Sequence, residues 1–107
     1  MFILNDGEAL LMSILAYYHK SGIEQVIGDL KVTNQRTIFE SKQHYILQGH
    51  IEFLNKDIQT VEPFNSFILV PNGVKITLKS EQEYKFKLTD RERLIHILLK
   101  QKESSTT

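Results

Sequence analysis

Apolar and polar residues alternate in two neighbouring segments within residues 74–88, which limits this part of the chain to a sheet with one buried face. In residues 74–78 and 84–88 every second side chain is apolar, which is the period of a β-strand with one buried face. Pro71-Asn72-Gly73 stands directly before the first run. Asn-Gly at such a place favours a hairpin turn, because both residues tolerate positive φ. With a second turn at residues 81–83, we expect residues 67–70, 74–78 and 84–88 to form three consecutive antiparallel strands.

The period of the pattern changes after these strands. Thr89-Asp90-Arg91-Glu92 matches a capping box, in which the first and fourth side chains satisfy backbone N–H groups at the start of a helix. The apolar residues that follow recur at helical spacing. They are Leu94, Ile95, Ile97, Leu98 and Leu99. We therefore expect a helix over about residues 90–101, followed by a disordered polar tail at residues 104–107.

Further strand patterns occupy the middle of the chain. Residues 28–33 alternate, Asn34-Gln35 is a plausible reversal, and residues 36–40, 51–54 and 58–64 read as more strands. Residues 8–20 are ambiguous. Their alanine, leucine and methionine content favours a helix, but a strand buried on both faces would have an equally apolar sequence.

Several of these segments resemble the GRAM domain pattern. The resemblance rests on Asp6-Gly7-Glu8, on residues 28–41 and 58–61, on the hairpin within residues 71–86, and on the terminal helix. It covers about residues 6–100. It implies a mainly β, PH-like fold: a seven-stranded barrel or sandwich of two antiparallel sheets capped by the C-terminal helix. It also makes residues 8–20 the first strand, because tertiary context commonly overrides local propensity.

The resemblance is to a stand-alone GRAM domain of the bacterial type, which predicts one domain over residues 1–103. Lysine plus arginine and aspartate plus glutamate number 13 each, so no overall positive charge draws the chain to nucleic acid. There is no cysteine, which suits a reducing compartment. The apolar run at residues 9–18 is too short to span a bilayer and does not fit a signal peptide. We expect a cytoplasmic protein, either free or peripheral at the membrane.

Residues capable of catalysis do not form a recognisable set. The histidines are His19, His44, His50 and His96. His44 and His50 have no standard zinc spacing, and no nucleophile elbow, phosphate-binding loop or dinucleotide fingerprint occurs. The sequence therefore predicts no enzyme activity, no catalytic residue, no metal and no cofactor.

One candidate binding surface is a set of lysines on the last two strands. Alternation places all of them on the outward face if these strands pair. Such a face can attract anionic headgroups or acidic partners, although outward lysines also keep a strand soluble and protect its edge. That second explanation is favoured. The four residues are Lys75, Lys79, Lys85 and Lys87. In PH-like folds the resemblance also implies headgroup binding near the first hairpin loops, where Lys20 and Arg36 are the cations to consider beside His19.

The other candidate surface is the helix. Its apolar residues cover an arc of roughly 200°, which is wider than a core-facing stripe requires. Ile95, Ile97 and Leu99 are therefore candidates for protein interaction, with either Ile97 or Leu99 left exposed. An equally weighted alternative is that residues 2–4 fold back over this edge.

The function expected from the sequence is that of a non-catalytic binding module. The first hypothesis is binding of a protein partner, or self-association into a homo-oligomer, through the helix face. The alternative is peripheral binding of anionic, phosphoinositide-like membrane lipid through the basic residues.

Overall fold

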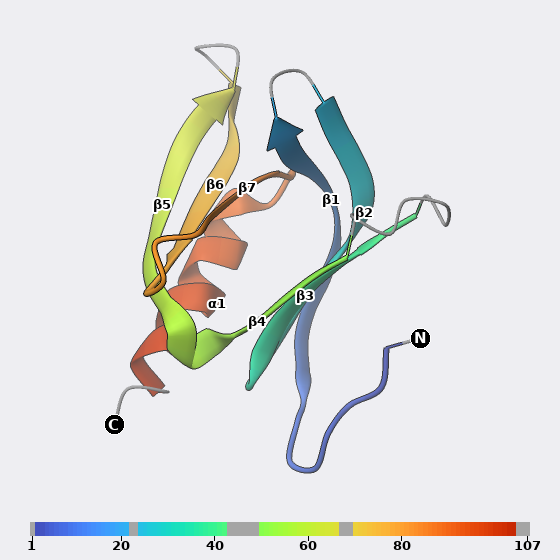
Figure 1. The fold of residues 1–107 in the computed structure, drawn as a ribbon, viewed down its shortest axis with the longest axis vertical. Coiled ribbons are helices and arrows are strands. Elements are labelled where there is room, and N and C mark those ends of the chain that lie inside the picture. The colour runs from blue at the N-terminus through green and yellow to red at the C-terminus, as the bar shows by residue number, and fades with distance from the viewer. Residues whose placement is uncertain (1, 22–23, 43–49, 67–69, 105–107) are drawn as a thin grey trace.

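The computed structural model describes residues 2–21, 24–42, 50–66 and 70–104. These residues form seven strands, one 3₁₀ turn and one α-helix (Figure 1). In chain order the elements are β1 (Leu10–Ser21), β2 (Glu24–Thr33), β3 (Arg36–Ser41), β4 (Ile51–Leu54), η2 (Asn55–Asp57), β5 (Ile58–Ser66), β6 (Val70–Leu78), β7 (Glu83–Lys87) and α1 (Arg91–Ser104).

All seven strands belong to one antiparallel sheet in the order β4-β3-β2-β1-β7-β6-β5. The expected number of strands, their antiparallel pairing and the C-terminal helix are confirmed, but the expectation of two separate sheets is wrong. The reason is the pairing of β7 with β1, in which Tyr17 lies opposite Lys87 and His19 opposite Lys85. This pairing joins the two halves into one sheet. Its ends are β4 and β5, which do not pair, so the sheet is not closed into a barrel.

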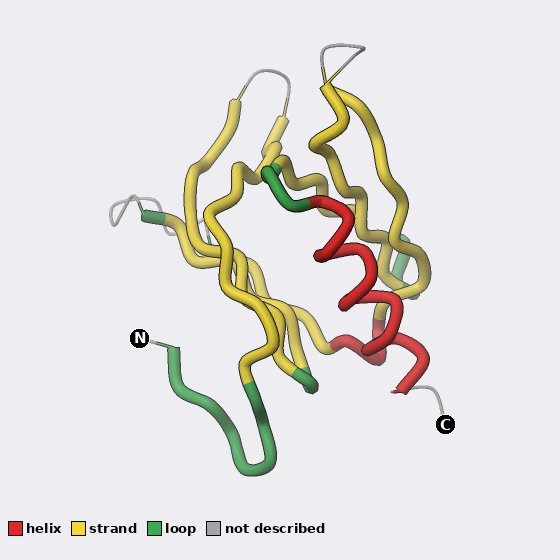
Figure 2. The backbone as a smooth tube through the Cα atoms, turned by 180° about the vertical axis from the view of Figure 1, so that it is seen from behind, coloured by secondary structure: helices red, strands yellow, loops and turns green. Residues whose placement is uncertain are grey.

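The sheet bends so that its two halves face each other, and α1 crosses the opening between them (Figure 2). We call the face toward α1 the inner face and the opposite one the outer face. The core lies on the inner face, where the rings of Tyr18, Phe39 and Phe86 have centroids 5.5 to 5.9 Å apart. Leu94 and Leu98 of α1 are fully buried against this core.

Residues 10–21 form strand β1, so the helix favoured by local propensity is wrong and the strand implied by the resemblance is confirmed. β1 pairs with β2 along most of its length and also with β7. Met12 and Ala16 are buried on its inner face, whereas Leu15 and Tyr17 point outward and are 48% and 45% exposed. Hydrogen bonds and packing from the strands on both sides of β1 outweigh the local propensity of these residues for a helix.

The expected hairpin turn at Pro71-Asn72-Gly73 is wrong, because all three residues lie inside β6. Ser66 pairs with Val70, and most of the strand expected at 67–70 lies outside the described residues. Gly73 lies opposite Phe64, and a Cβ atom at Gly73 would be 2.5 Å from the Phe64 ring. Glycine is needed here for a close approach of a ring, not for a turn.

Helix α1 begins one residue later than the capping box predicts. The Leu94 N–H donates to the Asp90 carbonyl at 3.3 Å, which places Asp90 and not Thr89 at the N-cap position. The helix continues to Ser104, three residues beyond the expected end. Ser104 therefore belongs to the helix and not to a disordered tail. Residues 105–107 lie outside the described part.

Residues 2–5 form an N-terminal arm on the outer face of β2 and β3, on the far side of the sheet from α1 (Figure 1). The Phe2 ring lies 4.9 Å from the Lys31 ammonium and 5.2 Å from the Arg36 guanidinium carbon. Ile38 faces outward beside this arm and is nevertheless buried. The expectation that residues 2–4 cover the helix is therefore wrong.

Candidate binding surfaces

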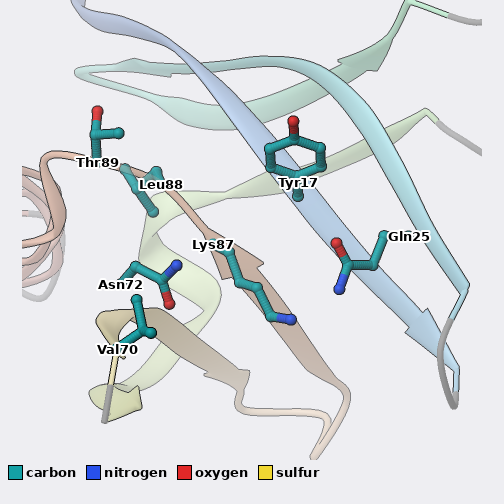
Figure 3. A pocket seen from close by; sticks show the side chains of 7 residues that line it. All are labelled: Tyr17, Gln25, Val70, Asn72, Lys87, Leu88 and Thr89. Carbon is teal, nitrogen blue, oxygen red and sulfur yellow. The ribbon is translucent and has the colours of Figure 1, made fainter. Parts of the chain in front are cut away.

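A pocket of about 550 Å³ opens beside the end of β7 (Figure 3). It is lined by residues from β1, β2, β6, β7 and the segment that joins β7 to α1. They are Tyr17, Gln25, Val70, Asn72, Lys87, Leu88 and Thr89.

The pocket exists because β7 is shorter than its neighbours. β7 stops at Lys87, which lies between Tyr17 of β1 and Gly73 of β6. Beyond this point the chain turns toward α1, so β1 and β6 extend past the end of β7. The Leu88 N–H donates to the Asn72 carbonyl at 3.0 Å and holds the buried Leu88 side chain beside the opening.

The lining combines apolar surface with a few polar groups, as ligand sites commonly do. Tyr17 and Val70 are half-exposed and Leu88 is buried, while Lys87 extends between the amides of Asn72 and Gln25 (Figure 3). Leu15 lies two residues from Tyr17 on the same face of β1, so the apolar surface continues out of the pocket. We call Leu15, Tyr17 and the pocket residues the β7 surface.

The sequence predicted only Lys87 among these pocket residues. No signal along the chain could have assembled the others, because Tyr17 and Lys87 become neighbours only through the β1–β7 pairing. The outward position of Tyr17 follows from alternation once residues 10–21 are known to be a strand. The sequence interpretation instead treated that strand as buried on both faces.

Three of the four predicted lysines share the outer face of β6 and β7. Lys75 lies directly opposite Lys85. The Lys75 ammonium is 3.9 Å from the Glu83 carboxylate, and the Lys85 ammonium lies over the Phe64 ring at 5.9 Å. Lys79 is exposed beyond the end of β6. Two of these lysines therefore already have contacts within the domain, Lys75 with a carboxylate and Lys85 with an aromatic ring.

The other two predicted cations differ in what the structure describes. Lys20 lies in β1, but its side chain lies outside the described part. Arg36 begins β3 and is 13% exposed. Its Nε and Nη2 donate to the Glu8 carboxylate at 2.8 and 3.1 Å, and Nη2 also donates to the Ile3 carbonyl at 2.7 Å. Arg36 thus holds the N-terminal arm and lies apart from the lysines.

The Glu8 side chain is inaccessible to solvent. The hydrogen bonds from Arg36, helped by those from the Thr33 hydroxyl and the Asn5 backbone, lower the pKa of Glu8 from 4.5 to about 2, against the opposing effect of burial. Glu8 therefore stays ionised at any physiological pH. Its role is to fix the arm and the β2–β3 turn.

On helix α1 the three predicted interaction residues have different environments. Ile95 and Ile97 are partly buried and pack against the core, whereas Leu99 is 44% exposed. A depression of about 470 Å³ adjoins Leu99, with His96, Lys100, Lys102 and Glu103 around it. Most of the wide apolar arc of the helix therefore packs against the core of the domain, and Leu99 is its exposed part.

Within residues 2–21, 24–42, 50–66 and 70–104, no three histidine, aspartate or glutamate side chains are grouped to hold a metal ion. His50 lies 3.7 Å from Glu52, and His44 lies outside the described residues. In the same part of the chain, no helix has the length and apolar character that crossing a bilayer requires.

The antiparallel seven-stranded sheet with a C-terminal helix defines a PH-like module. A domain of an unknown protein from Leishmania infantum superposes with a TM-score of 0.77 at 18% identity, covering 92% of this chain and 87% of that one. The Vps36 N-terminal PH domain superposes with a TM-score of 0.72 at 18% identity, covering 95% and 84%. The human RhoA complex with the DH/PH fragment of PDZRHOGEF gives 0.71 at 9% identity, covering 91% and 29%.

The sequence model of the GRAM domain matches residues 1–105. The chain therefore belongs to the GRAM domain family, as the resemblance implied. No curated protein matches it. GRAM and PH-like domains are modules that bind proteins or lipids.

Proposed function

We propose that this chain is a non-catalytic binding module that docks a protein partner on the β7 surface. The observation that carries the proposal is the pocket beside Leu88, which continues onto the half-exposed Leu15 and Tyr17. Apolar surface that neither the core nor the N-terminal arm covers is typical of sites where proteins meet. Tyrosine at such a place is favoured because it buries a large area at low entropic cost.

The helix face of Ile95, Ile97 and Leu99 is a weaker candidate for the same function. Two of its three residues already pack against the core. Leu99 remains, with charged side chains beside it. A docking surface built on one leucine would supply little apolar area.

Affinity purification from the source cells, with surface variants in parallel, tests this proposal. Val70→Asp changes the wall of the pocket, Leu99→Asp changes the helix face, and Lys79→Glu is a charged control beyond β6. We expect Val70→Asp alone to lose the proteins that the wild type recovers. Loss with Leu99→Asp instead would move the docking site to the helix, and equal recovery by all variants would exclude both surfaces.

Binding of anionic lipid headgroups is a second candidate function. The juxtaposition of Lys75 and Lys85 on the outer face supports it, with Lys79, Lys87 and Lys20 as further cations. Sedimentation with phosphatidylserine or phosphoinositide vesicles at low salt tests it. Binding should fall as salt rises and should be lost when Lys85 and Lys87 are both changed to glutamate. No sedimentation at low salt would exclude it.

A further inference from the structure

The pocket of the β7 surface combines apolar side chains with one lysine. Val70 and Leu88 lie on one side of Lys87, and Tyr17 and Gln25 lie on the other (Figure 3). Lys85 is two residues from Lys87 on the same strand and therefore faces the same way. An occupant that fits both the apolar side chains and the lysine must carry an apolar group within a few ångströms of a negative one.

We propose that the pocket binds a short acidic peptide segment in which an apolar side chain neighbours a carboxylate. The inference rests on the proposed docking function and specifies the partner's chemistry. The apolar side chain packs against Val70 and Leu88, and the carboxylate lies against Lys87. The amide of Gln25 suits a peptide group, because a side-chain amide both donates and accepts hydrogen bonds.

Charge and spacing favour a peptide over a membrane surface. Recruitment to anionic membranes by charge takes clusters of about four to eight basic residues, whereas Lys75 on this face is close to Glu83 and the chain has a formal net charge of zero. Leu15 and Tyr17 are alternate residues of one strand, roughly 6.6 Å apart along it. Alternate side chains of an extended peptide have the same spacing, so a peptide lying along β1 can meet both.

Fluorescence polarisation with synthetic peptides tests the proposal. The probe is a labelled eight-residue peptide with one tryptophan flanked by two aspartates in a glycine–serine background. Two matched peptides replace either both aspartates by asparagine or the tryptophan by serine. We expect the acidic tryptophan peptide to bind, and the asparagine peptide to bind at least about threefold more weakly, as the loss of one exposed charge pair implies. The serine peptide should also bind more weakly, because it loses the apolar side chain that the pocket buries.

Protein variants locate the binding. Lys87→Gln should weaken the acidic peptide about threefold to fivefold and leave the asparagine peptide unchanged, Val70→Asp should abolish binding of both, and Lys79→Gln should change nothing. Thermal unfolding of each variant verifies that it is folded. Equal binding of the aspartate and asparagine peptides, or no binding of either, would overturn the inference.

The outcomes separate this inference from the function on which it rests. If Val70→Asp still loses a cellular partner while the peptides fail, the docking function stands and the acidic chemistry is wrong. If phosphatidylserine vesicles bind in a Lys87-dependent manner and the peptides do not, the site is a headgroup site and the inference fails.

Discussion

Glu8 and Arg36 form the most strongly coupled pair of side chains among the described residues of this domain. Glu8 is inaccessible to solvent and receives hydrogen bonds from Arg36, Thr33 and Asn5. These contacts join the N-terminal arm, the end of β2 and the start of β3. Their effect is on stability, so changes here should leave the β7 surface intact.

Glu8→Gln should lower the free energy of unfolding by about 2 kcal/mol, because the poorly exposed Arg36 guanidinium then keeps only the half-exposed Glu52 carboxylate, 3.3 Å away, as a countercharge. Urea unfolding measures the loss. Glu40→Gln is the matched control, since the Lys31–Glu40 pair at 3.2 Å is partly exposed and should contribute less than about 1 kcal/mol. Equal losses for the two variants would contradict this account.

The same carboxylate predicts how stability depends on pH. The pKa of Glu8 is about 2 in the folded chain and 4.5 ordinarily, so the unfolded chain takes up this proton at the higher pH. The stabilisation is complete above the ordinary pKa and is lost as pH falls through 4.5 toward 2. Urea midpoints measured from pH 7 to pH 3 should therefore fall more steeply in the wild type than in Glu8→Gln. Parallel curves would show that Glu8 is not the responsible group.

At the scale of elements, β6 is held against β5 by a ring packed onto a glycine. Gly73→Ala would place a methyl group 2.5 Å from the Phe64 ring and should destabilise the domain by about 2 kcal/mol through overpacking. Adding Phe64→Leu should restore part of the loss, because a smaller side chain makes room. Thermal unfolding of the two single variants and the double variant measures this coupling. Additive losses would mean that the ring and the methyl group do not meet.

The elements also show what local sequence can predict. Alternation located β2, the second half of β6 and β7, and the change of period located α1, because each of these has one buried face. Asn72-Gly73 misled the prediction, because the same dipeptide that suits a turn also suits a strand that meets an aromatic ring. The strand β1 was recognised only through the family resemblance, since its apolar residues carry no information about its two partners.

For the whole molecule, the candidate site depends on sheet order and was therefore out of reach of the sequence. Lys87 could be placed on an outer face by alternation. Its neighbours Tyr17 and Gln25 could not be predicted, because they depend on the pairing of β7 with β1. The sequence predicted that either Ile97 or Leu99 would be exposed, and Leu99 is. Ile95 and Ile97 are partly buried against the core, and the role of all three in protein interaction stays a prediction.

Strand β5 is an edge of the sheet, and its unpaired side affects how strongly copies of the domain associate. Arg91 Nη1 donates to the Phe64 carbonyl at 2.9 Å and to Asn65 Oδ1 at 3.3 Å, so it occupies a backbone acceptor of this edge strand. Arg91→Ala should free the acceptor and raise self-association, because unpaired strand edges pair with other chains. Light scattering over a concentration series measures it, with the exposed Arg93→Ala as control. Identical behaviour of the two variants would show that Arg91 does not protect the edge.

The pairing of β7 with β1 also has a consequence for synthesis on the ribosome. β1 is synthesised before the other strands, but its second edge stays unpaired until β7 has been synthesised. The helix α1, which covers the core, follows later still. Almost the whole chain must leave the exit tunnel before the sheet can be completed. Nascent chains that stop before Lys87 should therefore expose an apolar strand to chaperones, and chains released past α1 should fold in one cooperative step.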